Sequence, residues 1–152
     1  MNQQSGRSLI EVIGVMAIMG LMTVAALGMF QVMRANQKRT IANATLEQIA
    51  ANTKLLLEMR DDYTGVSVDY LIKAGALQSD RAPIGGENWS VTSSVDGTSF
   101  SINLVDLTTG ECDYFSTTKP QWATKMLVNG FETGYAENCF ESDTNQISFI
   151  VE

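Results

Sequence analysis

The sequence predicts an α+β fold, in which one long N-terminal helix packs against a small antiparallel β-sheet. A helical pattern runs from about residue 9 to residue 60, and no proline interrupts it. Short β-rich runs separated by turn residues follow in the C-terminal half. With 152 residues, the chain has room for one domain.

The helical pattern begins with an apolar block from Leu9 to Met33. As a helix, these 25 positions would span about 37 Å, which exceeds the roughly 30 Å hydrocarbon core of a membrane. Glu11 is the only ionisable residue in the block. A secretory signal peptide fits less well, because Met1–Gly6 carries no basic side chain and the apolar run is too long. We therefore expect a retained membrane helix.

The same helix is expected to continue through Arg34–Arg60, where residues of high helix propensity dominate. Apolar and small residues recur there at spacings of three and four, which places a stripe on one side of the helix: Ala42, Leu46, Ile49, Thr53 and Leu56. We expect this stripe to pack on the domain that follows. A free-standing coiled coil is the alternative.

Turn residues at Asp61-Asp62 and Gly65 are expected to end the long helix. A short helix at Tyr70–Ala74 follows, with Ser67 or Asp69 as its N-cap.

The β-rich runs Trp89–Ser94 and Thr98–Leu104 predict a hairpin that turns at Asp96-Gly97. Pro120–Val128 is predicted to form a third short helix, since proline is favoured in the first helical turn. Gln146–Val151 predicts a final strand. We expect Trp89 and Trp122, in or near these elements, to pack in the core.

The composition argues against several classes of function. A net charge of −7 argues against nucleic acid as the main partner, because phosphate binding needs a basic surface. Histidine is absent, which removes imidazole-based catalysis and most metal sites. We therefore expect no enzymatic activity, no cofactor and no metal. Acidic loops at Asp61-Asp62, Asp106, Glu141 and Asp143 offer calcium ligands as the alternative, but they lack a recognised spacing.

Cys112 and Cys139 are the only cysteines and lie 27 positions apart. In a small domain that follows a membrane segment, the pair is expected to form one disulfide in an oxidising compartment. Closing a loop of that length would stabilise the fold by about 3–4 kcal/mol. A pair of free, buried thiols is the alternative.

The N-terminal sequence Gly6-Arg7-Ser8-Leu9-Ile10-Glu11-Val12 resembles the processing site of type IV prepilins and the related pseudopilins. The family pattern is a short leader ending in glycine, an aliphatic stretch, and a glutamate five residues beyond that glycine. The resemblance implies that a prepilin peptidase cuts between Gly6 and Arg7 and methylates the new α-amino group. It also implies that Glu11 pairs with the N-terminal ammonium of a neighbouring subunit, and that Gly20 and Gly28 weaken the helix.

The C-terminal half resembles the type IVb pilins of the bundle-forming, toxin-coregulated and conjugative thin-pilus kind. Four segments in the same order carry this resemblance: Pro83-Ile84-Gly85-Gly86, the run from Phe100 to Leu107 leading to Cys112, Val128-Asn129-Gly130, and Cys139 with the C-terminal run Thr144–Phe149. The resemblance covers nearly the whole chain and implies the type IV pilin fold, with one disulfide in the globular head.

From this resemblance we expect a leader at residues 1–6, a transmembrane and filament-core helix at 7–33, its amphipathic continuation at 34–60, and a head at 61–152. The chain would be a pilus subunit, held in the bacterial inner membrane with a periplasmic head and then polymerised into an extracellular filament. Its partners would be copies of itself, the prepilin peptidase, the inner-membrane assembly machinery and the lipid bilayer. A type II secretion pseudopilin and a bitopic membrane protein that never polymerises are the alternatives.

The charges beside the apolar block give a conflicting signal about orientation. Arg34, Lys38 and Arg39 follow the block, and the positive-inside rule alone would place them in the cytoplasm. The processing motif and the cysteine pair both require the C-terminal part to lie outside the cytoplasm. We expect the latter orientation.

Overall fold

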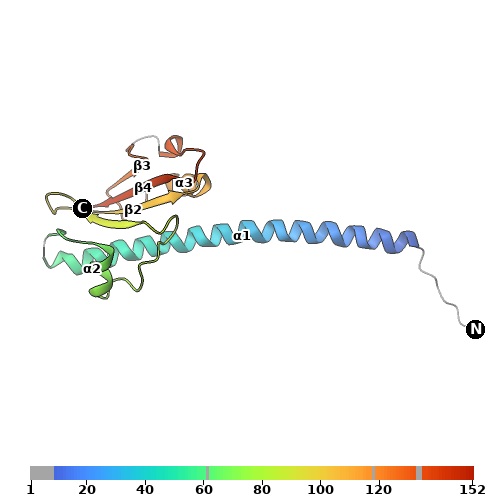
Figure 1. The fold of residues 1–152 in the computed structure, drawn as a ribbon, viewed down its shortest axis with the longest axis horizontal. Coiled ribbons are helices and arrows are strands. Elements are labelled where there is room, and N and C mark those ends of the chain that lie inside the picture. The colour runs from blue at the N-terminus through green and yellow to red at the C-terminus, as the bar shows by residue number, and fades with distance from the viewer. Residues whose placement is uncertain (1–8, 61, 118, 133–134) are drawn as a thin grey trace, which may run out of the picture. The chain divides into compact units, whose positions relative to one another are not determined.

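The computed structural model describes residues 9–60, 62–117, 119–132 and 135–152 (Figure 1). Along the chain the elements are α1 (Leu9–Glu58), α2 (Val68–Lys73), β1 (Ser90–Ser93), β2 (Phe100–Leu107), α3 (Thr109–Ser116), β3 (Lys125–Val128), the 3-10 helix η1 (Tyr135–Asn138) and β4 (Asn145–Val151). The chain divides into two compact units, one ending at Gln37 and the other, here called the head unit, comprising Lys38–Glu152.

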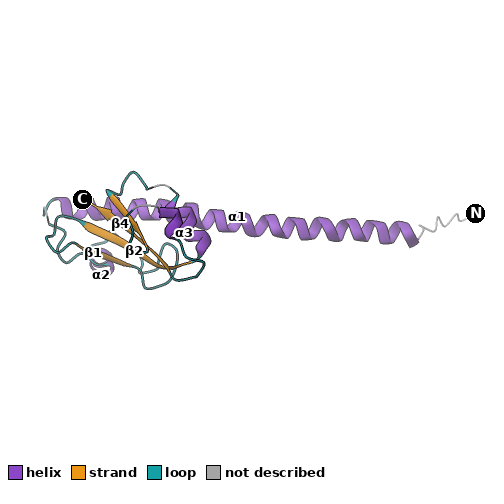
Figure 2. Cartoon of the chain, turned by 90° about the horizontal axis from the view of Figure 1, so that it is seen from above, coloured by secondary structure: helices purple, strands orange, loops and turns teal. Residues whose placement is uncertain are grey.

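The head unit is built on a four-stranded antiparallel sheet of order β1-β2-β4-β3 (Figure 2). The C-terminal strand β4 therefore lies in the middle of the sheet, between β2 and β3. Its register pairs Phe100 with Val151 and Leu104 with Ile147 on one side, and Met126 with Phe149 on the other. Buried and accessible residues alternate along β4, so one face of the sheet faces the core.

The second half of α1 supplies the other side of that core. Ala42, Leu46, Ile49 and Thr53 are buried, as the helical stripe predicts. The sequence predicted that Leu56 ends the buried stripe. In the structure Leu57 is buried instead, and Leu56 is partly exposed. Thr53 is fully buried, and its hydroxyl donates a hydrogen bond to the Ile49 carbonyl at 2.7 Å. The buried hydroxyl group is therefore paired.

The loop Pro83–Gly86 packs against an irregularity in β2. The register of β2 against β4 shifts between Leu104 and Leu107, and Asp106 adopts a positive φ of 53° there. Gly86 N–H donates to the Val105 carbonyl at 2.8 Å. A Cβ atom at Gly85 would lie 2.5 Å from that carbonyl oxygen, and one at Gly86 would overlap the Asp106 side chain. The two glycines are therefore required by the close approach of the loop to the strand.

The predicted helix at Pro120–Val128 is wrong. Lys125–Val128 forms the edge strand β3, and the residues before it form a turn in which Ala123 N–H donates to the Pro120 carbonyl. Met126 and Val128 are fully buried while Lys125 is exposed, which is the two-residue period of a strand. Pairing with β4 satisfies this segment's backbone and buries both side chains, and that gain outweighs the local preference for a helix.

The helix α3 was not predicted, although its start carries a clear signal. Thr108 Oγ1 accepts from the Glu111 N–H at 3.3 Å, and the Glu111 carboxylate accepts from the Thr108 N–H at 3.0 Å. This reciprocal pair is a capping box, and its Thr-x-x-Glu spacing can be read from the sequence. The α2 prediction holds, with Ser67 as the N-cap residue.

The expected hairpin forms between β1 and β2, with Asp96 and Gly97 in its connection. The Asp96 carboxylate accepts from Ser94 Oγ at 2.6 Å and from Thr98 N–H, and these hydrogen bonds lower the pKa of Asp96. Gly97 adopts a φ of 71°, and its carbonyl accepts from Tyr63 N–H at 2.9 Å. This contact ties the hairpin to the segment after α1.

Both tryptophans pack in the core as expected, Trp89 as a buried residue and Trp122 as a partly buried one. Trp89 is 6% exposed, and its indole N–H donates to the Asp80 carbonyl at 2.6 Å. Trp122 is partly buried, with its ring centre 5.1 Å from that of Phe149. The indole N–H of Trp89 thus finds the acceptor that burial requires.

The Pro83–Gly86 loop generates a prediction about two matched glycines. Gly85 and Gly130 both have positive φ, 81° and 87°, but an added Cβ would meet other atoms only at Gly85. Gly85→Ala is expected to lower the free energy of unfolding by about 1–3 kcal/mol more than Gly130→Ala, because only the former also overpacks the core. Urea unfolding of the detergent-solubilised chain, followed by tryptophan fluorescence, measures both. Equal losses would contradict the steric role of the loop.

Candidate assembly surfaces

The first unit contains a helical surface that the chain itself leaves uncovered. Every residue of α1 from Leu9 to Lys38 is exposed. Large apolar residues lie on all sides of the helix: at 100° per residue, Ile10 and Leu21 project from one side, whereas Val12 and Met19 project from the other. This part of α1 is long and apolar enough to cross a membrane. A helix that is apolar all round requires cover on every side.

Glu11 lies in the first turn of α1, exposed among apolar neighbours. A carboxylate is favourable there, because the N-terminal end of a helix carries a partial positive charge. The first basic residue after Glu11 is Arg34, 23 positions later and about 35 Å along the helix. The rest of the apolar block therefore offers Glu11 no ion-pair partner. Gly6 and Arg7, at the expected processing site, lie outside the described residues.

Gly20 and Gly28 lie inside α1, which continues through both without a break. A Cβ atom at either position would have no other atom within 4 Å. Packing within the chain therefore does not require glycine at these positions. If glycine has a role there, it lies in the low helix propensity or in the approach of another molecule.

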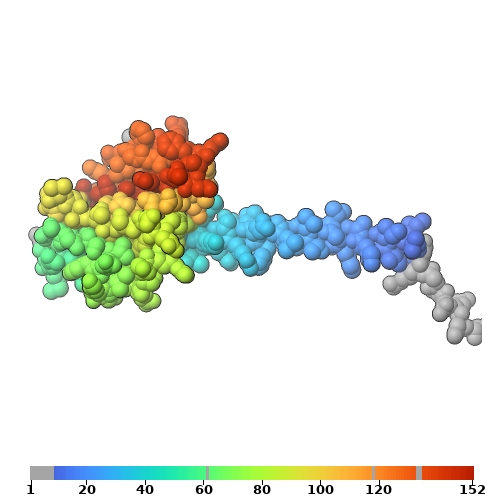
Figure 3. Space-filling view, in the orientation of Figure 1, coloured from blue at the N-terminus to red at the C-terminus, as the bar shows by residue number. Residues whose placement is uncertain are grey.

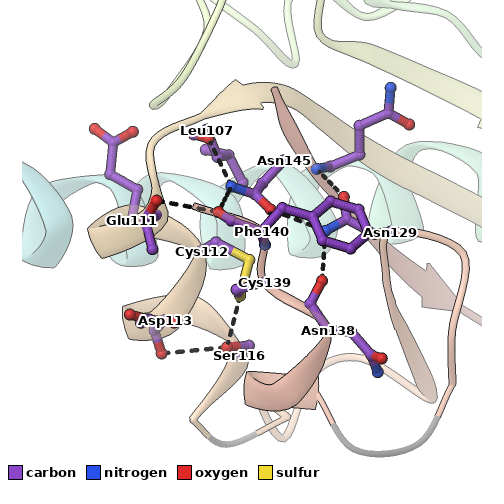
Figure 4. The surroundings of a disulfide bond; sticks show 12 residues. Leu107, Glu111, Cys112, Asp113, Ser116, Asn129, Asn138, Cys139, Phe140 and Asn145 are labelled. Carbon is purple, nitrogen blue, oxygen red and sulfur yellow. Dashed lines mark hydrogen bonds between the residues drawn. A yellow bond between two sulfur atoms is a disulfide. The ribbon is translucent and has the colours of Figure 1, made fainter. Parts of the chain in front are cut away.

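In the head unit, Cys112 and Cys139 form the expected disulfide, with their Cα atoms 5.8 Å apart (Figure 4). Cys112 is fully buried in α3, and Cys139 follows η1. The bond therefore fastens the segment that follows β3 to α3. This segment, between Asn129 and Thr144, is called the disulfide segment below. Exposed residues predominate among those described in it.

A buried asparagine anchors the disulfide segment to the sheet (Figure 4). The side chain of Asn145, at the start of β4, is fully buried. Its amide nitrogen donates to the carbonyls of Leu107, Phe140 and Ser142 at 3.3, 3.0 and 2.8 Å. Its amide oxygen accepts from Phe140 N–H at 2.7 Å and from Asn129 Nδ2 at 2.9 Å. One side chain thus holds the loop before β4 in a fixed conformation.

Asn129 extends this network to the neighbouring turn. Its side-chain nitrogen also donates to the Asn138 carbonyl at 2.6 Å, and its oxygen accepts from Gln146 N–H at 2.8 Å. Asn129 has a positive φ of 50°, which asparagine tolerates better than most residues. The sequence marked Asn145 only through the resemblance to known heads, and Asn129 through that resemblance and as a turn residue after the expected helix. Their part in one network depends on strand pairing that a sequence does not reveal.

No group of three or more acidic, cysteine or histidine side chains suitable for a metal is present among the described residues. Asp106, one of the acidic residues considered as a calcium ligand, lies at the irregularity in β2, and its side chain packs beside Gly86.

No protein-family model and no curated protein matches this chain. Solved structures do match, and one of them is the crystal structure of TcpA, a type IV pilin from Vibrio cholerae El Tor biotype. The likeness covers 76% of this chain and 99% of that chain, with a TM-score of 0.63 and 14% sequence identity. The long apolar N-terminal helix, the small antiparallel sheet and the disulfide together have the type IV pilin fold, as the sequence predicts.

The Asn145 network predicts that a single buried amide supports the disulfide segment. Asn145→Ala is expected to lower the free energy of unfolding of the head by about 2–3 kcal/mol, because it removes a buried amide and leaves the buried Leu107 carbonyl without this donor. Gln146→Ala is the matched control, since the Gln146 side chain is exposed and its loss is expected to change stability by less than about 0.5 kcal/mol. Urea unfolding measures both variants. Equal stability of the two variants would contradict the anchoring role.

Proposed function

We propose that this chain is the structural subunit, or pilin, of a type IV pilus of the type IVb kind. The observation that carries the proposal is the first part of α1, which is apolar on every side and wholly exposed, in a chain with the type IV pilin fold. Such a surface is stable in lipid or in a bundle of similar helices. The same helix serves first as a membrane anchor and then as the filament core, and no reaction is catalysed.

Processing at the N-terminus supplies the partner that Glu11 lacks. In this proposal a prepilin peptidase cuts between Gly6 and Arg7 and methylates the new amino group. The resulting ammonium of one subunit pairs with Glu11 of its neighbour among the packed helices. An ion pair in an apolar surrounding attracts strongly, whereas a lone buried carboxylate is costly. The pair therefore fixes the axial register of helices that are otherwise free to slide.

The disulfide and the apolar helix support the compartment that we propose. Before assembly the apolar helix lies in the bacterial inner membrane, and the head unit lies in the periplasm, where the Cys112–Cys139 disulfide forms and persists. Inner-membrane assembly machinery then transfers the subunit into the extracellular filament. The acidic chain has no expected role in direct binding of nucleic acid.

The mass of the mature chain tests processing. Protein sheared from the cell surface is expected to begin at Arg7, to be about 14 Da heavier through one methyl group, and to be about 2 Da lighter through the disulfide. Intact mass and N-terminal sequencing measure this. A chain that begins at Met1 and is found only in membranes would refute the pilin assignment and favour a bitopic protein that does not polymerise. A processed chain that never forms long surface fibres would favour a pseudopilin.

The role of Glu11 is tested by Glu11→Ala. The variant is expected to accumulate in the membrane and to be processed normally, but to give at least about tenfold fewer surface filaments, because the neighbouring ammonium is left unpaired. Glu47→Ala, which removes an exposed carboxylate from the head-unit part of α1, is the control and is expected to assemble normally. Quantitative immunoblots of sheared and membrane fractions measure both. Normal piliation of Glu11→Ala would exclude the pairing.

A further inference from the structure

Five of the chain's eight methionines lie in the apolar block of α1, and four of these five share one side of the helix. At about 100° per residue, Met19, Met22, Met29 and Met33 fall within an arc of about 80°, whereas Met16 lies about 100° from the middle of that arc. The four side chains are 61–74% exposed. This set of four residues is here called the methionine seam.

The only carboxylate of the apolar block lies on the same side of α1 as the methionine seam. Residues on this side follow one another at spacings of three and four along the whole block: Glu11, Val15, Met19, Met22, Ala26, Met29 and Met33. Such spacing keeps a row of side chains aligned along a helix, as it does where one helix packs lengthwise on another. The side that carries Glu11 is therefore also the side that carries most of the thioethers.

The position of Glu11 indicates what covers the methionine seam after assembly. In the proposed function the Glu11 carboxylate pairs with the N-terminal ammonium of another copy. A helical side chain projects from its own side of the helix, so the copy that supplies the ammonium approaches along the side of Glu11. The seam continues on that side, and its occupant in the filament is therefore the apolar helix of a second copy.

Methionine suits a helix that changes its surroundings, but it also brings a reactive group. Its unbranched side chain adapts to lipid and to the gaps between helices. Its thioether is oxidised to a sulfoxide, which is polar and disrupts apolar contacts. In a bilayer a helix can tilt or rise until a polar group reaches the headgroups, whereas an ion pair that fixes the register removes this freedom. Figure 3 shows the apolar part of α1, in blue, with no other segment of the chain over the face in view.

We propose that the methionine seam is a modification site, at which sulfoxidation by a peroxide keeps a stored subunit out of the filament. This inference rests on the proposed pilin function. One oxygen atom passes from hydrogen peroxide to the sulfur: the O–O bond breaks, an S–O bond forms, the sulfur loses two electrons, and the peroxide is reduced to water. The sulfoxide oxygen finds no hydrogen-bond donor among apolar side chains, so a copy that carries it does not pack along the seam. Subunits already in the filament have covered thioethers and are protected.

A measurement on the wild-type, full-length chain tests the modification site. Cells are sheared to remove filaments, protein synthesis is stopped, and the stored subunits are exposed briefly to hydrogen peroxide before filaments regrow. Peptide mass spectrometry then gives the sulfoxide fraction of each methionine in the membrane pool and in the new filaments. The fraction at the methionine seam is expected to be at least about fivefold lower in the filaments. Met59, which is 95% exposed in the head unit, is the control and is expected to carry the same fraction in both.

A set of conservative variants tests the same inference by yield. Replacing all four seam residues by leucine keeps their apolar volume, and this variant is expected to give filaments within about threefold of the wild-type yield, with or without peroxide. The wild-type yield is expected to fall at least about fivefold after a pulse that oxidises most of the stored pool. The matched control carries Met16→Leu and Met59→Leu, two exposed methionines outside the seam, and is expected to remain as sensitive as the wild type.

The outcomes separate this inference from the function on which it rests. An untreated wild-type chain that forms no filaments would overturn both. New filaments whose seam residues carry the same sulfoxide fraction as the membrane pool would overturn the modification site alone. Depletion of the Met16 sulfoxide as strong as that of the seam would overturn the assignment to one side of α1. Equal loss of yield in the leucine variant and the wild type would place the sensitivity outside the seam. The peptide measurement needs no variant, so it decides the question even if the leucine variant assembles poorly.

Discussion

The exposed apolar surface of α1 between Leu9 and Met33 is the constraint on which the rest of the molecule depends. Sixteen large apolar side chains are exposed in this block. Covering each one gains about 1.5–3 kcal/mol, so the total is tens of kcal/mol. A folded domain is stable by only about 5–15 kcal/mol. The environment of this helix therefore dominates the energetics of the chain.

Two accessible segments of the head unit are held in place by contacts with residues of the sheet and of α3. The Pro83–Gly86 loop is fitted to the irregularity in β2, and the disulfide segment is held by Cys139 and Asn145. In both places a polar backbone group that a loop would otherwise leave unpaired finds a partner inside the fold. The exposed side chains of the disulfide segment are therefore carried on a backbone that the disulfide and the Asn145 amide hold in place.

The sequence predicted those features that local patterns determine. The long helix was predicted from a run of residues with high helix propensity and from apolar residues spaced three and four positions apart. The hairpin was predicted from the turn residues Asp96-Gly97. The Lys125–Val128 segment was misjudged because its conformation depends on β4, a partner that lies some twenty residues further on. Of the candidate sites, the disulfide was predictable from the two cysteines together with the apolar segment that precedes the domain. The groove between the end of α1 and the turn after α2 was not, since it combines Leu55 and Met59 with Ala74–Ala76, whose proximity only the fold reveals.

The central position of β4 has a consequence for the order of events during synthesis. The apolar block is complete about 110 residues before β4 begins, which at about 5–20 residues per second is an interval of roughly 6–22 s. Strand β2 ends 38 positions before β4 begins, so for about 2–8 s of that interval one edge of β2 has no partner. The apolar block of α1 is therefore complete well before the sheet of the head unit can form. The sheet is complete only when the last strand, the seven-residue β4, has been made and has paired with β2 and β3.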